Sequence, residues 1–381
     1  MKNGRTLGQL ATEIERQATA KKDYIAPCAK MQLQVMERDN AKFPVLALLD
    51  GNGGKRFGMK DIAHEQLASR LEIPRTYYDR MRAEAPGLLA GNVNHWLGQT
   101  VNEKAMMVRT LDAEVRAILS NRYRPLDNHD LAEAVLPIIQ EQELYIVSCE
   151  LTERKLYIKA FDKRIAREIT RAGTDPAHTF MTDVIYPALT ISNSEVGCGS
   201  VSVAAGLYTG GCTNFASFSD SRMRKYHIGG KAAGSEDFYA LLSDDTKRLT
   251  DQAIWAQTRD VVRSAFEMTR FEELLGRVQA TTEQKIDGDV VGVVEVTGKR
   301  YGMNDGERDS VLKHLIKGGD LSRYGLFNAV TRAAEDLPDY DRATQFERFG
   351  GDIIELSPKD WEVINTGKAS KAKLVAVTDE N

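Results

Sequence analysis

The chain has few cysteines and no long hydrophobic run, and both absences restrict its class. Its 381 residues include four cysteines: Cys28, Cys149, Cys198 and Cys212. They are too few and too scattered for a disulfide framework, so we expect them to be reduced. No apolar run reaches the length of about 18 residues that a membrane span needs, and the N-terminus has no signal-peptide core. We therefore expect a cytoplasmic protein with no membrane association.

Recognisable catalytic signatures are also missing. Gly-Asn-Gly-Gly at 51–54 is not followed by the Gly-Lys-Ser/Thr order of an ATP-binding loop, and Ser194 lacks a nucleophile elbow. The gaps of fourteen and fifteen residues between Cys198, Cys212 and His227 do not match the short paired spacings of zinc sites. The sequence therefore predicts no cofactor, no metal and no catalytic residue, and favours binding over bond-breaking.

The composition is that of a folded protein, with 42% hydrophobic and 28% charged residues. The net charge of −4 is unevenly distributed. Residues 1–234 contain 31 basic and 27 acidic residues (+4), and residues 235–381 contain 20 and 28 (−8). A surface that binds nucleic acid or phosphate is therefore expected in the first part, although both parts could also be ordinary solvated surfaces.

Hydrophobic periodicity predicts an α+β fold. The expected fold has a central twisted, mainly antiparallel sheet with packed helices, a long helix and a small α-rich C-terminal domain. Alternation at Met31, Leu33 and Val35 predicts a hairpin, and Asp127 or Asn128 is expected to cap a helix. We expect four regions: an N-terminal hairpin plus helical subdomain (1–103), a central β-rich domain that binds nucleic acid (104–234), a long helical segment (235–286) and a small acidic C-terminal domain (287–381).

Residues 58–81 have the spacing of two helices packed across a tight turn. In a DNA reader, the second helix would direct Arg75, Thr76, Tyr78 and Asp79 toward the major groove. Glu72 occupies the turn position where glycine is commonest, because that residue usually has a positive φ. The segment is interpreted either as a DNA-reading pair or as a packed helical hairpin.

Two segments concentrate cations around an aromatic ring. The first is SNRYRPLDN, in which Arg122 and Arg124 flank Tyr123, and Arg109 precedes it on a strand. The second is SRMRKYHIGGK, which supplies Arg222, Arg224, Lys225, Tyr226, His227 and Lys231. Arginines and lysines bind phosphates while rings stack on bases, so both segments predict contacts to a single strand. The alternative for the first is a strand-to-helix turn whose arginines pair with carboxylates.

Several segments resemble a known family. They include VRTLDAEVRAILSNRYRPLDNHDL, ISNSEVGCGSVSVAAGLYTGGCTN, RMRKYHIGG and HLIKGGDLSRYGLFNAVTRAAEDLPDYDRATQFERFGGDII. Together they are similar to the phage and plasmid-like proteins grouped as domain of unknown function nine-three-two, from about residue 30 to residue 361. The resemblance implies a mobile-element context and a distant link to single-strand annealing recombinases of the RecT and Rad-fifty-two kind, which form rings or filaments and need no ATP.

The resulting hypothesis is ATP-independent binding and annealing of single-stranded DNA in phage or plasmid recombination. The expected partners are single-stranded DNA, further copies of the chain, and a nuclease or single-strand-binding protein. A helix-turn-helix regulator, and an anti-defence factor with a polar pocket around Ser192, Asn193 and Glu195, are the alternatives. The C-terminal apolar residues could form an oligomer interface or a private core; they are Leu312, Leu315, Ile316, Leu321, Tyr324, Leu326 and Phe327.

Overall fold

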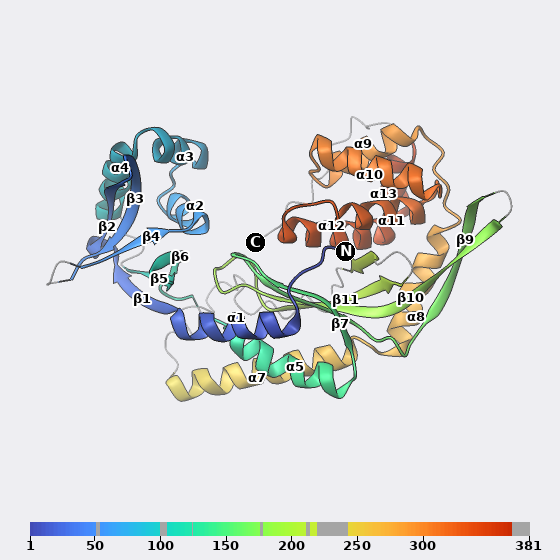
Figure 1. The fold of residues 1–381 in the computed structure, drawn as a ribbon, viewed down its shortest axis with the longest axis horizontal. Coiled ribbons are helices and arrows are strands. Elements are labelled where there is room, and N and C mark those ends of the chain that lie inside the picture. The colour runs from blue at the N-terminus through green and yellow to red at the C-terminus, as the bar shows by residue number, and fades with distance from the viewer. Residues whose placement is uncertain are drawn as a thin grey trace.

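The expected α+β class is confirmed in the computed structural model, which contains two sheets and a helical C-terminal region (Figure 1). The residues that the structure describes are 1–50, 54–99, 105–123, 125–175, 178–210, 214–218 and 243–367.

The first sheet forms an N-terminal lobe with three helices. Its strands are β1 (Lys22–Pro27), β2 (Met31–Arg38), β3 (Ala41–Leu48), β4 (Lys55–Met59), β5 (Ala105–Leu111) and β6 (Glu114–Ser120), and a short 3₁₀ helix (Cys28–Lys30) joins β1 to β2. Their order is β1-β5-β6-β4-β3-β2, and β4 and β6 run parallel whereas the other pairs are antiparallel. The helices are α2 (Asp61–Arg70), α3 (Arg75–Glu84) and α4 (Pro86–Gln99).

The predicted hairpin is present as β2 and β3. Asp39 and Asn40 form its two-residue turn with φ values of 54° and 63°, which suit the right-handed twist of the flanking strands. Leu33 and Leu46 face each other across the pair and are buried in a core shared with the helices. Alternation along the strand thus fixed which face is covered.

The second sheet lies at the centre of the molecule. Its strands are β7 (Tyr145–Leu151), β8 (Leu156–Phe161), β9 (Arg167–Asp175), β10 (His178–Asn193), β11 (Ser202–Thr209) and β12 (Asn214–Ser217). The order is β12-β11-β10-β8-β7, with β9 paired to the first half of β10. One face is covered by α1 (Leu7–Ala20), α5 (Asn128–Glu141) and α7 (Asp244–Ser264), which share a core with alternate residues of β8 and β10 (Figure 1).

The C-terminal helices pack together and against the end of the central sheet. They are α8 (Met268–Thr281), α9 (Val290–Arg300), α10 (Asp305–Gly318), α11 (Arg323–Ala333), α12 (Tyr340–Glu355) and α13 (Pro358–Asn365). Beneath α12, Lys159 of β8 lies 2.5 Å from Glu347, and both side chains are fully buried. Burial lowers the pKa of Lys159. Such a pair fixes the docking of α12, since either charge alone would be costly to bury.

Some expected boundaries differ from the structure. Strands β5 and β6 belong to the sheet of the N-terminal lobe, so the division between the sheets falls after residue 120 and not near residue 103. The long helical segment is divided into α7 and α8. In the C-terminal region, the hydrophobic core of the subunit itself contains Leu315, Tyr324, Leu326 and Phe327, while Ile316 and Leu321 are exposed.

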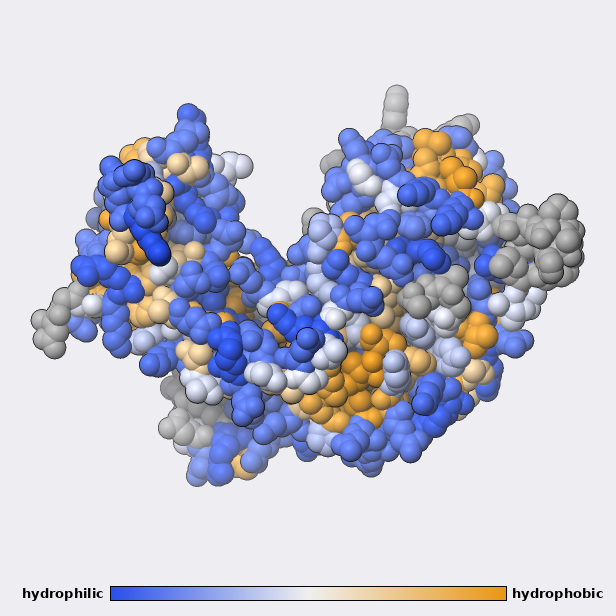
Figure 2. Space-filling model, viewed as in Figure 1, coloured by the Kyte–Doolittle hydropathy of each residue, from blue (hydrophilic) through white to orange (hydrophobic). Residues whose placement is uncertain are grey.

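The space-filling view shows a hollow between the N-terminal lobe and the C-terminal helices (Figure 2). A hydrophobic area lies below these helices on the same face, near the beginning of β7. Among the described residues, none of the helices combines the length and apolar character that crossing a membrane requires.

Candidate nucleic-acid interface

Arg109 was predicted to bind phosphate, but the structure gives it an internal role. Its side chain is 2% exposed, and its guanidinium donates to Asp23 Oδ1 (2.9 Å), Asp127 Oδ1 (3.1 Å) and the backbone oxygen of Glu195 (2.8 Å). A buried guanidinium with three protein acceptors has no donor directed at solvent. We therefore correct the prediction: Arg109 is a structural residue that joins the two sheets.

Glu195 is the centre of the same buried polar cluster. One carboxylate oxygen accepts the backbone N–H of Asn128 (2.7 Å), the first residue of α5, and the other accepts from Arg116 (2.9 Å). Lys21 contacts Asp127 at 2.6 Å. Although burial raises the pKa of Asp127, its hydrogen bond to Lys21 and the nearby positive charges lower it overall. Lys21, Arg109 and Arg116 thus balance Asp23, Asp127 and Glu195; we call these six residues the interlobe hub.

The 193–198 loop that supplies Glu195 forms no open pocket around these polar residues. Asn193 donates to the backbone oxygen of Leu126 (2.7 Å) and to Asn128 Oδ1 (2.9 Å). Ser194 donates to the backbone oxygen of Arg154 (2.8 Å). Asn193, Ser194 and Glu195 are each at most 3% exposed. This part of the chain therefore joins the lobes, and it gives no support to the alternative of a polar binding pocket there.

Tyr123 also belongs to the joint between the lobes. Its ring is half-buried against an apolar cluster, and its hydroxyl lies 3.2 Å from the backbone oxygen of Ser194. Burial raises the pKa of Tyr123 to about 12. Because the ring already packs against side chains of the protein, its position does not favour the predicted stacking on a base. Arg122 is exposed, and Arg124 lies outside the described residues.

The second predicted segment, 222–231, lies entirely outside the described residues. The contacts proposed for Arg222, Arg224, Lys225, Tyr226, His227 and Lys231 stay predictions.

The predicted helix pair is present as α2 and α3. Glu72 has φ 54°, and the Ile73 N–H donates to the backbone oxygen of Ala68 (2.9 Å), which closes α2 in the manner usually reserved for glycine. Glu143 has φ 52° after α5, where a strand follows. A residue with positive φ thus ends both α2 and α5 in this protein. The conformation of Glu72 is therefore no specific sign of a DNA-reading helix pair.

The side chains of α3 correct the predicted groove contacts. Tyr78 is fully buried and its hydroxyl lies 2.8 Å from His64 Nδ1, whereas the neighbouring Tyr77 is 46% exposed. Arg75 pairs with Asp79 at 2.6 Å. Two of the predicted base-reading residues thus bind each other and a third lies in the core, so the packed hairpin is the better interpretation.

One group of side chains in the described part of the chain lies close enough together to hold a metal ion. His129, Asp130 and Glu133 place one ligand atom each within 4.8 Å of one another on the first turns of α5. All three come from one helix and are partly or largely exposed, which is ordinary for a solvated helix face. Cys198 is half-buried beside Arg154, and Cys212 and His227 lie outside the described residues.

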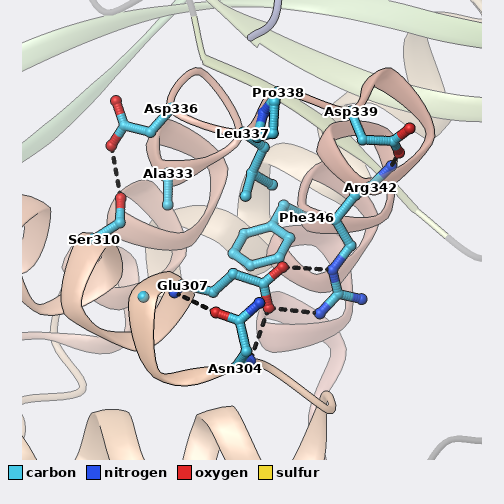
Figure 3. Close-up of a pocket in the computed structure, with 11 residues that line it drawn as sticks. Asn304, Glu307, Ser310, Ala333, Asp336, Leu337, Pro338, Asp339, Arg342 and Phe346 are labelled. Carbon is cyan, nitrogen blue, oxygen red and sulfur yellow. Dashed lines mark hydrogen bonds and ion pairs between the residues drawn. The ribbon is translucent and has the colours of Figure 1, made fainter.

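A pocket of about 420 Å³ lies between α10, α12 and the turn before α12 (Figure 3). On one side, Arg342 makes two bonds of 2.8 Å to the carboxylate of Glu307; on the other, Ser310 (2.6 Å) and His314 (2.8 Å) both bind Asp336. The Ser310 hydroxyl therefore faces a carboxylate and not the imidazole, so the arrangement lacks the nucleophile–base contact of a hydrolase.

A group of cations that the sequence interpretation missed lies on the N-terminal lobe. Its members are exposed and have no carboxylate partner in the described part of the chain; they are Lys22, Lys30, Lys42, Lys55 and Arg56. We call these five side chains together the cationic strand surface, since they come from β1, β3, β4 and the short helix before β2. They surround the strands and do not form one flat face, because Lys55 and Arg56 are successive residues of β4 and point to opposite faces of the sheet. Residues 21–60 contain eight basic and four acidic residues, so a local charge count would have indicated this region.

Aromatic rings accompany these cations. The Lys55 ammonium lies 5.0 Å from the ring centroid of Tyr24, which in turn contacts Phe57 at 5.6 Å. Phe43 is 36% exposed and faces Met36 across the hairpin. Tyr24 is half-buried and Phe57 is buried in the core of the lobe, so Phe43 is the exposed ring among these three. Cations together with an exposed ring are the combination that binds single strands without reading their sequence.

No family model matches the chain, and no curated protein or solved structure is significantly similar to it. The resemblance to phage and plasmid-like proteins therefore stays a prediction.

Proposed function

We propose that this protein binds single-stranded DNA through the cationic strand surface and anneals complementary strands without ATP. The observation that carries the proposal is the concentration on the N-terminal lobe of five exposed cations that have no carboxylate partner among the described residues. Phosphate contacts supply most of the affinity of sequence-independent binding, because each neutralised phosphate releases a counterion.

The contrast with other arginines supports this assignment. Arg16, Arg75, Arg80 and Arg154 each lie within 3.0 Å of a carboxylate oxygen, so their charge is already balanced. Arg56 instead donates to the neutral side chain of Gln34 at 2.8 Å. An incoming phosphate would therefore meet uncompensated charge on β1–β4.

Annealing requires that bases stay accessible while the backbone is held. Lysines on a strand surface suit this need, since an ammonium binds a phosphate as a point charge and makes no demand on base identity. A cytoplasmic setting in phage or plasmid recombination, assembly into a ring or filament, and a partner nuclease belong to the same proposal.

Salt dependence tests the proposal. The triple variant Lys22→Ala/Lys55→Ala/Arg56→Ala should reduce the slope of log K against log salt by about two for a dT oligonucleotide, because each lost contact on a single strand removes roughly 0.7. The matched control is Lys313→Ala/Lys317→Ala/Lys359→Ala, which removes three exposed charges from the C-terminal helices. Equal slopes for the triple variant and the unmodified protein would exclude the cationic strand surface.

A further inference from the structure

Four rings from four strands gather on one face of the central sheet. Tyr145 of β7 lies opposite Phe161 of β8, and Tyr186 of β10 lies opposite Tyr208 of β11. The ring centroid of Phe161 is 5.4 Å from Tyr145, 5.2 Å from Tyr186 and 4.5 Å from Tyr208. We call these four residues the aromatic face. The strand pairing places each ring, so their arrangement is part of the fold.

The four rings differ in their exposure, because Phe161 is buried in a small cluster with Met1, Ala188 and Phe215, against which Tyr186 and Tyr208 pack. Phe161 is 8% exposed, Tyr186 and Tyr208 are half-buried, and Tyr145 is 55% exposed. The hydroxyls of the three tyrosines form no hydrogen bond with any other described residue. Buried phenols usually find a partner, so unpartnered hydroxyls on half-exposed rings indicate a face directed at solvent or at a ligand.

Other tyrosines of the same sheet region behave differently. Tyr157 lies four residues before Phe161 on β8, and its hydroxyl donates to Asp341 of α12 (2.8 Å). Tyr340 of α12 shares a 2.7 Å hydrogen bond with Ser148 of β7. Helix α12 therefore covers one part of this sheet face, where tyrosine hydroxyls form hydrogen bonds between the helix and the sheet. The tyrosines of the aromatic face form no such hydrogen bond with any described residue.

We propose that bases of the bound single strand stack on the aromatic face. This inference rests on the proposed function. It adds contacts to the bases to the phosphate contacts of the cationic strand surface. Tyrosine rings on neighbouring strands suit flat heterocycles, and such stacking is tolerant of sequence because every base has a π-face. Lys163 follows β8 two residues after Phe161, is exposed, and has no carboxylate partner in the described part of the chain, so a phosphate can be held beside a stacked base.

An abasic strand separates stacking from charge. The unmodified protein should bind a dT oligonucleotide more tightly than an abasic oligonucleotide of equal length and charge. The variant Tyr145→Leu/Tyr186→Leu should lose about tenfold or more of its affinity for the dT strand and little for the abasic strand, since each stacked base contributes a factor of this order. Tyr145→Phe/Tyr186→Phe keeps the rings and should bind both strands as the unmodified protein does.

The possible outcomes distinguish this inference from the proposed function. If the leucine variant is folded, as judged by its thermal unfolding, and loses affinity equally for both strands, the aromatic face does not stack bases. If it binds both strands normally while the cationic variant loses its salt slope, single-strand binding stands and the aromatic face serves another partner, such as an apolar segment of a protein. The single variant Tyr145→Leu alters the most exposed ring alone and tests the same contact should the double variant fail to fold.

Discussion

The interlobe hub and the cationic strand surface use the same kinds of charged residue for opposite purposes. In the hub, Arg109 and Arg116 are 2% and 12% exposed, and carboxylates or backbone oxygens meet their donors. On the strand surface, Lys22, Lys55 and Arg56 are exposed and meet no carboxylate among the described residues. The comparison teaches that a cluster of cations in a sequence indicates a binding site only when the folded protein places no carboxylates beside those cations.

Removing one member of the hub should produce the largest change in stability. Glu195→Ala removes the acceptor of the first N–H of α5 and the carboxylate partner of Arg116, and it leaves Lys21 with Asp127 alone. Breaking a buried charge pair in this way costs about 3–5 kcal/mol of unfolding free energy. Urea unfolding monitored by circular dichroism measures the loss.

The control for this variant is Glu65→Ala, which breaks the exposed Arg154–Glu65 pair. Its cost should stay below about 1 kcal/mol, because water screens and replaces such a contact. Similar losses for Glu195→Ala and Glu65→Ala would contradict the description of the hub as a buried structural joint.

The core of the N-terminal lobe should respond to pH. Burial lowers the pKa of His64 from its ordinary 6.5 to about 3. Between pH 6.5 and pH 3, His64 is protonated in the unfolded chain and neutral in the folded chain. The unfolding free energy therefore decreases as pH falls through this range, by up to about 1.4 kcal/mol per pH unit. His64→Gln, which cannot titrate, should show a shallower decrease in unfolding titrations between pH 6.5 and pH 3.

If His64→Gln keeps the full slope of the unmodified protein, the imidazole of His64 is not buried in its neutral form.

The smallest effect is expected at the turn between α2 and α3. Glu72 has φ 54°, a conformation that a side chain disfavours and glycine adopts readily. Glu72→Gly should therefore stabilise the protein by about 0.5–1 kcal/mol, as measured by thermal unfolding. Glu84→Gly, inside the last turn of α3, should instead destabilise it by about 1 kcal/mol. Changes of the same sign in both variants would contradict the assigned turn conformation.

Short-range features could be predicted from the sequence. The alternation of Met31, Leu33 and Val35 identified the hairpin of β2 and β3. The position of Glu72 in the turn was also recognised, since its place between two amphipathic segments depends only on local spacing.

Features that depend on distant partners could not be predicted. Arg109 binds Asp23, which is 86 residues away, and Glu195, also 86 residues away on the other side. Only the pairing of β1 with β5 and the position of the 193–198 loop bring these groups together. Tyr78 was predicted to face the groove although it is buried, because a helical phase error of one residue moves a side chain by about 100° around the axis. The aromatic face was missed since its register across four strands leaves no mark in the sequence.

Lysine acetylation footprinting tests the central claim most directly. The protein is treated with an acetylating reagent with and without a saturating dT oligonucleotide, and the modified lysines are quantified by mass spectrometry. We predict that DNA protects Lys22, Lys30, Lys42 and Lys55, whereas Lys313 and Lys317 of α10 react equally in both samples. Equal modification of the four strand-surface lysines with and without bound DNA would contradict the account.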